Sequence, residues 1–164
     1  MDTSMGGPRH EIDRGIYGMP AFTSLQVSDL SVSRQWWTDG LGFVELAVMP
    51  GPDGPESLIH LRRYRYQDVL LVGGRDPGAP APVGVMVSFA HAGPLGEHAE
   101  TADRLRSLGA GDVSGPDETP WYAVQATAAD PDGYTGRADC SLRTGTARAV
   151  DRMVRDSVTG GVDP

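Results

Sequence analysis

The stretch FTSLQVSDLSVSRQWWTDGLGF, from Phe22 to Phe43, decides the fold. Its first six residues are rich in β-branched and aromatic types, which predict a strand. Ser28 and Asp29 then offer side-chain oxygens to the free N–H groups of a helix start. Gly40 predicts the end of that helix, because glycine enters the left-handed C′ conformation at little cost. A second strand is predicted over 43–48.

The predicted helix is short and carries two adjacent tryptophans. Val32, Trp36 and Trp37 are spaced so that they give it one apolar face. At least one tryptophan is expected in the core, and Trp36 is the better candidate.

The remainder of the first half predicts two more strands. A loop rich in proline and glycine covers 49–56, and strands are predicted over 57–63 and 66–74. A linker stiffened by prolines follows over 75–82. The order of elements is therefore β-α-β-β-β.

The second half repeats this order, with a helix over 97–108. Strands are predicted over 83–90, 112–114, 122–128 and 134–142, with DPDG as the turn of the last hairpin. The fold class is α+β, with two βαβββ modules forming a cupped mixed β-sheet around a cavity. Residues 1–18 are expected to form a flexible arm, and 144–164 an amphipathic C-terminal helix and tail.

Composition excludes several classes of function. The net charge of −8 argues against nucleic acid as a partner. No apolar run approaches the length of a membrane span, and no signal-peptide core is present. Cys140 is the only cysteine, so no internal disulfide can form and a cytoplasmic protein is expected. All 14 basic residues are arginine, which excludes mechanisms that need a lysine.

Three motifs carry a family resemblance. VSDL with the aromatic pair and GLGF lies within 27–43, PW stands at 120–121, and DPDGY at 130–134. Together they resemble the vicinal oxygen chelate superfamily, which includes glyoxalase I, extradiol dioxygenases and fosfomycin-resistance enzymes. The bleomycin-resistance branch is the most similar. The resemblance covers 21–142, with modules over 21–74 and 83–142.

Metalloenzymes of this superfamily hold a divalent ion at equivalent places in the two modules. The resemblance puts these ligand positions at Phe22, near Leu71, near Gly84 and at Arg137. None of these side chains suits a site built from oxygen and nitrogen ligands. The four histidines are scattered and lack metal-binding spacing. We therefore predict a protein with no metal and no cofactor.

The strand period of two places Phe22, Ser24 and Gln26 on one face, expected to line the cavity. An alternative is that Phe22 and Met86 fill a closed core. His60 lies in mid-strand and faces either the cavity or solvent. Val69, Gly84 and Thr135 are expected beside the cavity. The predicted ligand-binding residues are Phe22, Ser24, Gln26, Trp37, His60, Leu71, Met86, Ser88, Trp121, Tyr122 and Arg137.

Trp121 is the residue most closely tied to binding. The resemblance implies that the tryptophan of the PW motif forms a ligand groove by stacking on a flat ring. The alternative is a packing aromatic beside a turn. Tyr122 replaces the usual glycine, which reshapes the groove and disfavours bleomycin itself.

The sequence favours a metal-free homodimer that binds a small aromatic or polycyclic molecule, such as a drug or natural product, and sequesters it. The sequence favours binding over catalysis and does not decide between them. One alternative is a metal-independent isomerase, cyclase or lyase of secondary metabolism. Its acid/base candidates are Asp68, His60, Arg137 and Asp139. A small-molecule-binding accessory protein is the third possibility.

Overall fold

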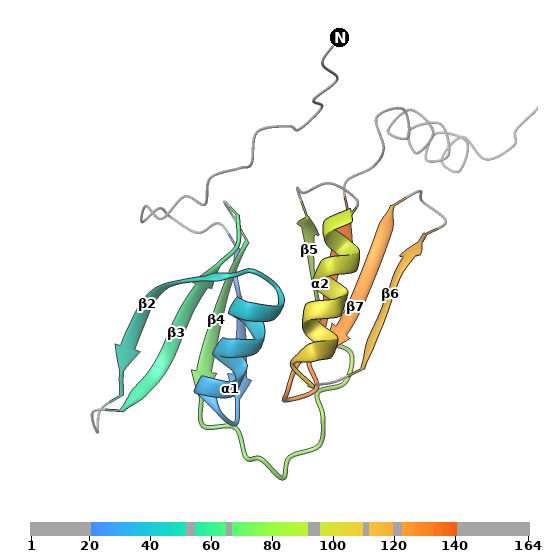
Figure 1. The fold of residues 1–164 in the computed structure, drawn as a ribbon. Coiled ribbons are helices and arrows are strands. Elements are labelled where there is room, and N and C mark those ends of the chain that lie inside the picture. Colours follow the sequence, from blue (N-terminus) through green and yellow to red (C-terminus); the bar gives the residue numbers. More distant parts are fainter. Residues whose placement is uncertain are drawn as a thin grey trace, which may run out of the picture.

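The computed structural model describes residues 21–51, 55–64, 67–91, 96–109, 112–119 and 123–140, with side chains for all of these except 90, 91, 96, 97 and 136–140. It contains the two predicted βαβββ modules (Figure 1). The first comprises β1 (Thr23–Val27), α1 (Leu30–Gln35), the π-helical turn η1 (Trp36–Gly40), β2 (Val44–Pro50), β3 (Glu56–Arg62) and β4 (Asp68–Gly73). The second comprises β5 (Met86–His91), α2 (Gly96–Ser107), β6 (Val113–Glu118), β7 (Val124–Ala129) and β8 (Thr135–Cys140).

Each module forms one four-stranded mixed sheet. The strand orders are β1-β4-β3-β2 and β5-β8-β7-β6. In each sheet the first strand pairs in parallel with the last, and the other pairs are antiparallel. The two helices lie together on one side of the sheets (Figure 1). The α+β class and the repeat of two modules are confirmed.

The start of α1 matches the prediction from sequence. Asp29 Oδ1 accepts hydrogen bonds from the backbone N–H groups of Ser31 and Val32, at 2.8 and 3.0 Å. The predicted apolar face was wrong at Val32, which is 48% exposed. The buried stripe runs through residues 33, 36, 37 and 40, and Val32 lies about 90° from its centre at 100° per residue.

Two glycines end the helical segment in different ways. Gly40 was predicted to adopt the left-handed conformation, but it lies inside η1, and Gly42 has the positive φ of 75°. Gly40 is instead a point of close approach between helices. A Cβ added there would lie 2.6 Å from Cδ2 of Leu105 in α2. The α1–η1 segment therefore packs directly against the helix of the other module.

The core lies between the helices and the adjacent face of each sheet. In the first module it includes Leu25, Val27 and Leu71. Aromatic rings join the modules: Phe43 makes edge-on contacts with Trp37 and Phe89, at centroid distances of 5.1 and 5.3 Å. Because Phe89 belongs to β5, this cluster ties the second sheet to the first module.

The DPDG turn forms the predicted β7–β8 hairpin and also clamps the modules together. The Asp132 carboxylate accepts a hydrogen bond from the backbone N–H of Ser28 at 3.0 Å. Arg75 Nε lies 3.4 Å from the same carboxylate. The Tyr134 hydroxyl donates to the Gln26 carbonyl at 3.1 Å. The turn of the second module is thus bound to the end of β1.

Some element boundaries differ from the predictions. The predicted loop over 49–56 is shorter, because β2 extends to Pro50 and β3 begins at Glu56. The short strand predicted over 112–114 extends to Glu118 through a cis Gly115–Pro116 bond. The predicted N-terminal arm and C-terminal helix lie outside the described residues. No helix in the described part of the chain has the length and apolar character needed to cross a membrane.

Candidate functional site

Each sheet has a cup face, which is the face turned away from its helix. In the first sheet the cup face carries Ser24, Gln26, His60, Leu70 and Val72, as the strand register requires. Ser24 and Gln26 are exposed, and Phe22 just before β1 is 51% exposed. The predicted split of β1 into an outer set and a core set is therefore correct.

Two predicted site residues lie in the core instead. Leu71 pairs with Leu25, so it shares the helix-side face and is 0% exposed. Trp37 is also 0% exposed, within the aromatic cluster. Neither side chain can reach a ligand on the cup face. Leu70 and Val72 occupy the places in β4 that face the same way as Ser24 and Gln26.

His60 lies on the cup face in a cluster of polar side chains. Its Nε2 is 2.7 Å from Asp68 Oδ1. Arg62 Nε donates a hydrogen bond to the same oxygen at 2.8 Å. Asp68 faces Arg62 across the β3–β4 hairpin, which places the two charged groups side by side. The hairpin thus brings together two acid/base candidates from the sequence, His60 and Asp68.

The cup face of the second sheet is more polar. Met86 pairs with Thr135 on β8, and Ser88 pairs with Arg137. Met86 is 52% exposed and Ser88 is also exposed. Arg137 also pairs with Thr127 of β7, so these backbone positions follow one another across the sheet. The side chain of Arg137 lies outside the described set.

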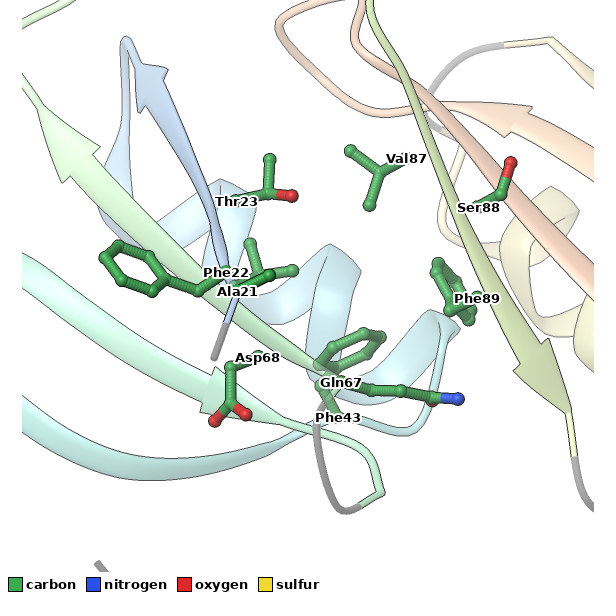
Figure 2. A pocket seen from close by; sticks show the side chains of 10 residues that line it. Ala21, Phe22, Thr23, Phe43, Gln67, Asp68, Val87, Ser88 and Phe89 are labelled. Atoms are coloured by element: carbon green, nitrogen blue, oxygen red, sulfur yellow. The ribbon is translucent and has the colours of Figure 1, made fainter. Parts of the chain in front are cut away.

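A cavity of about 320 Å³ lies between β1 and β4 of the first module and β5 of the second (Figure 2). Phe43 and Phe89 meet at its base, and Asp68 lies at its edge. It is lined by Ala21, Phe22, Thr23, Phe43, Gln67, Asp68, Val69, Val87, Ser88 and Phe89. From the predicted ligand set the cavity brings together Phe22 and Ser88, while Ser24, Gln26, His60 and Met86 lie outside its lining.

A wider cavity, of about 790 Å³, lies at the module junction beside the DPDG turn. Asp130 in this turn is 3% exposed. Burial raises its pKa to about 6, against the opposing effect of hydrogen bonds from the backbone N–H groups of Tyr134 and Asp132. The Trp37 indole N–H also lowers this pKa, although its geometry falls short of a hydrogen bond. This side chain responds to pH but lies on the side of the sheets away from the cup faces.

The residues that the structure describes do not fit a divalent metal ion. Within the described ranges, no group of three or more histidine, cysteine, aspartate or glutamate side chains is placed to hold one. His60 and Asp68 form a pair of possible metal ligands, but the Asp68 carboxylate already forms an ion pair with Arg62. Apart from Asp68, the cup-face positions on β1 and β4 carry hydroxyl, amide and aliphatic groups.

Several lining residues escaped prediction from sequence. Phe43 and Phe89 meet only because the two modules pack together, and no pattern within one module indicates their contact. The pairing of Arg62 with Asp68 had a readable signal, since the two flank a short hairpin. Trp121 and Tyr122, predicted to form the groove, lie outside the described residues.

Comparison with known proteins places these features in a family. The sequence profile of the Glyoxalase/Bleomycin resistance protein/Dioxygenase superfamily matches residues 20–136. No curated protein matches the chain.

Solved structures with the same fold include proteins linked to antibiotics. TnmS3, an antibiotic binding protein from Streptomyces sp. CB03234, is 26% identical with a TM-score of 0.52, over 73% of this chain and 92% of that one. A glyoxalase/bleomycin resistance protein from the same strain is 27% identical with a TM-score of 0.51, over 72% and 96%. The fosfomycin resistance protein FosX from Listeria monocytogenes is 12% identical with a TM-score of 0.57, over 79% and 97%, a likeness of fold. The chain belongs to the Glyoxalase/Bleomycin resistance protein/Dioxygenase superfamily.

Proposed function

We propose that this protein binds a small aromatic or polycyclic molecule on its cup faces without a metal, and sequesters it. The ligand would be a drug or natural product, and the biological result would be antibiotic resistance. We place this activity in the cytoplasm, where a chain with a single cysteine needs no disulfide. The similarity to TnmS3, an antibiotic binding protein, supports an antibiotic as the ligand.

The observation that carries the proposal is the exposure of large apolar side chains on the cup side of both sheets. Phe22 is 51% exposed and Met86 is 52% exposed. Burial of apolar area is favourable by about 25 cal/mol per Å². A ligand that covers these two side chains would therefore gain binding free energy from their burial. The alternative of a closed core filled by Phe22 and Met86 disagrees with this exposure.

We further propose that two copies of the chain cover these faces. A ligand alone is small compared with two four-stranded sheets, and exposed apolar groups also include Val83 and Val85 before β5. Two-fold dimers are the commonest soluble oligomers. In such a dimer each ligand would lie between a sheet of one chain and a sheet of its partner.

Binding without turnover has a direct test. The protein is incubated with a panel of polycyclic antibiotics. Each compound is then recovered after denaturation, and its molecular mass is measured by mass spectrometry. Sequestration predicts a stoichiometric complex, recovery of the unchanged compound, and protection of a susceptible bacterium that expresses the protein. Conversion of a bound compound to a new mass would refute sequestration.

The second candidate function is a metal-independent isomerase, cyclase or lyase. The hydrogen bond between His60 and Asp68 favours it, because an oriented imidazole is a common general base. Chromatography of the recovered compound before the mass measurement separates the two functions, since an isomerase leaves the mass unchanged but alters chromatographic retention.

Trp121 remains a proposed groove residue on the resemblance alone. If it stacks on a flat ring, Trp121→Ala should weaken binding about tenfold or more, and Trp121→Phe should weaken it less. Circular dichroism should show that both variants stay folded.

A further inference from the structure

The polar cluster on the cup face has a marked asymmetry of burial. The Asp68 side chain is 0% exposed and that of Arg62 is 1% exposed, whereas that of His60 is 17% exposed. The carboxylate and the guanidinium therefore form a buried pair of opposite charges. Removal of either side chain from such a pair is strongly destabilising. Of the three side chains, that of His60 is the most exposed, so it is the one that a ligand can contact.

The hydrogen bonds around Asp68 determine which nitrogen of His60 carries the proton. Oδ1 of Asp68 already accepts a hydrogen bond from Arg62, and an ionised carboxylate can only accept. His60 must therefore donate through Nε2–H. In the neutral ring the other nitrogen, Nδ1, is then an acceptor. No other hydrogen bond of His60 is formed within the part of the chain that the structure describes.

The surroundings of His60 on this face are mixed. His60 pairs with Leu70, and Leu70 pairs with Ser24, so these three positions follow one another across the sheet. A flat ring lying on Leu70 would bring its edge within reach of the imidazole. A hydrogen-bond acceptor fixed beside an apolar group such as Leu70 can orient a small ligand in a protein site.

We propose that His60 is the polar anchor of the cup, with Nδ1 accepting a hydrogen bond from a hydroxyl group on the edge of a planar aromatic ligand. Asp68 is a positioning residue that fixes the ring and its tautomer, and Arg62 holds Asp68 in place. The inference rests on the proposed binding function and adds a ligand class: aromatic molecules with a phenolic or enolic O–H, in preference to their O-methylated forms.

The test compares two probes that differ only in this group, 2-naphthol and 2-methoxynaphthalene. Affinities are measured by isothermal titration at about pH 8, where an ordinary imidazole is neutral. The wild-type protein should prefer 2-naphthol by about tenfold, the effect of one hydrogen bond. His60→Phe keeps a flat ring without either nitrogen, so it should lose this preference and bind both probes with similar affinity.

The possible results distinguish failure of the proposed role of His60 from failure of the proposed binding function. Equal affinity of the wild-type protein for both probes would overturn the anchor and leave the aromatic site standing. Binding of neither probe at millimolar concentration would overturn both. A preference that persists in His60→Phe would assign the hydroxyl to another residue and overturn the anchor.

Nitrogen-15 spectra of the imidazole provide a second measurement that does not depend on a variant that folds. The free protein should show a protonated Nε2 and an unprotonated Nδ1 at His60, and 2-naphthol should shift the Nδ1 resonance. A tautomer protonated at Nδ1 would overturn the proposal. In Asp68→Asn, provided circular dichroism shows that it folds, the tautomers should become mixed; a buried pair with no role in positioning His60 would leave the tautomer unchanged.

Discussion

Trp37 illustrates how one side chain joins the two modules. It is 0% exposed, makes an edge-on contact with Phe43 at 5.1 Å between ring centroids, and makes a tilted contact at 6.3 Å with Phe89 in β5 of the second module. Trp37→Ala should lower the free energy of unfolding by about 3–5 kcal/mol, as large-to-small changes in cores do. Phe22→Ala is the exposed control and should cost less than about 1 kcal/mol. Urea unfolding followed by circular dichroism measures both, and equal losses would contradict this placement of the two rings.

Asp130 should make stability depend on pH. Its pKa rises from 3.8 to about 6 on folding, chiefly through burial. Between these values the unfolded chain has lost the proton while the folded chain keeps it, so stability falls as pH rises from about 4 to about 6. The full difference corresponds to at most roughly 3 kcal/mol.

Asp130→Asn isolates this effect, because an amide does not titrate. As pH rises from about 4 to about 6, the unfolding free energy of the wild-type protein should fall relative to that of Asp130→Asn. Urea unfolding at a series of pH values gives this difference. A difference that stays constant with pH would show that Asp130 titrates normally in the folded protein.

Strand alternation could be predicted from sequence within one strand but not between strands. The outward set on β1, Ser24 and Gln26, follows from the period of two and is correct. The prediction for β4 failed at Leu71, because its face depends on the register between β1 and β4. β1 and β4 are far apart in the chain, so no local sequence pattern records this register.

The contact between helices gives a prediction for Gly40. Gly40→Ala places a methyl group against Leu105 and should destabilise the protein by about 1–3 kcal/mol, as overpacking does. Leu105→Ala in the same chain should relieve part of this cost, giving a favourable coupling in a double-mutant cycle.

Gly42 is the matched control for that cycle. A Cβ there meets nothing within 4 Å, but φ is positive. Gly42→Ala should therefore cost about 1 kcal/mol through backbone strain, and the cost should be independent of Leu105→Ala. Coupling of Leu105 to Gly42 but not to Gly40 would contradict the helix packing described above.

At the scale of the whole molecule, exposed apolar side chains predict self-association. The wild-type protein should sediment as a dimer at tens of micromolar. Phe22→Asp together with Met86→Asp should shift it towards monomer, because charges would be buried without partners. Circular dichroism should show the fold unchanged. A wild-type monomer at these concentrations would refute a site shared between two chains.

The arrangement of modules explains why only part of the candidate site could be predicted. Motifs in single segments identified the fold and the family, and strand alternation placed Ser24 and Gln26 on the exposed face of β1. The base of the cavity depends on Phe43 and Phe89, which come from different modules and meet only where the modules pack together. The sequence did not predict which way His60 faces or what it contacts. Its role depends on the neighbouring side chains of Asp68 and Arg62, which the fold brings beside it.

Titration of the isotope-labelled protein with 2-naphthol, followed by backbone amide spectra, tests the central claim most directly. The account predicts that the largest shifts occur at Ser24, Gln26 and Ser88 on the cup faces, that Ala102 and Leu105 in α2 shift little, and that the spectrum of the naphthol recovered after a day is unchanged. Shifts confined to the cavity around Asp130, or no shifts at millimolar probe, would contradict binding on the cup faces.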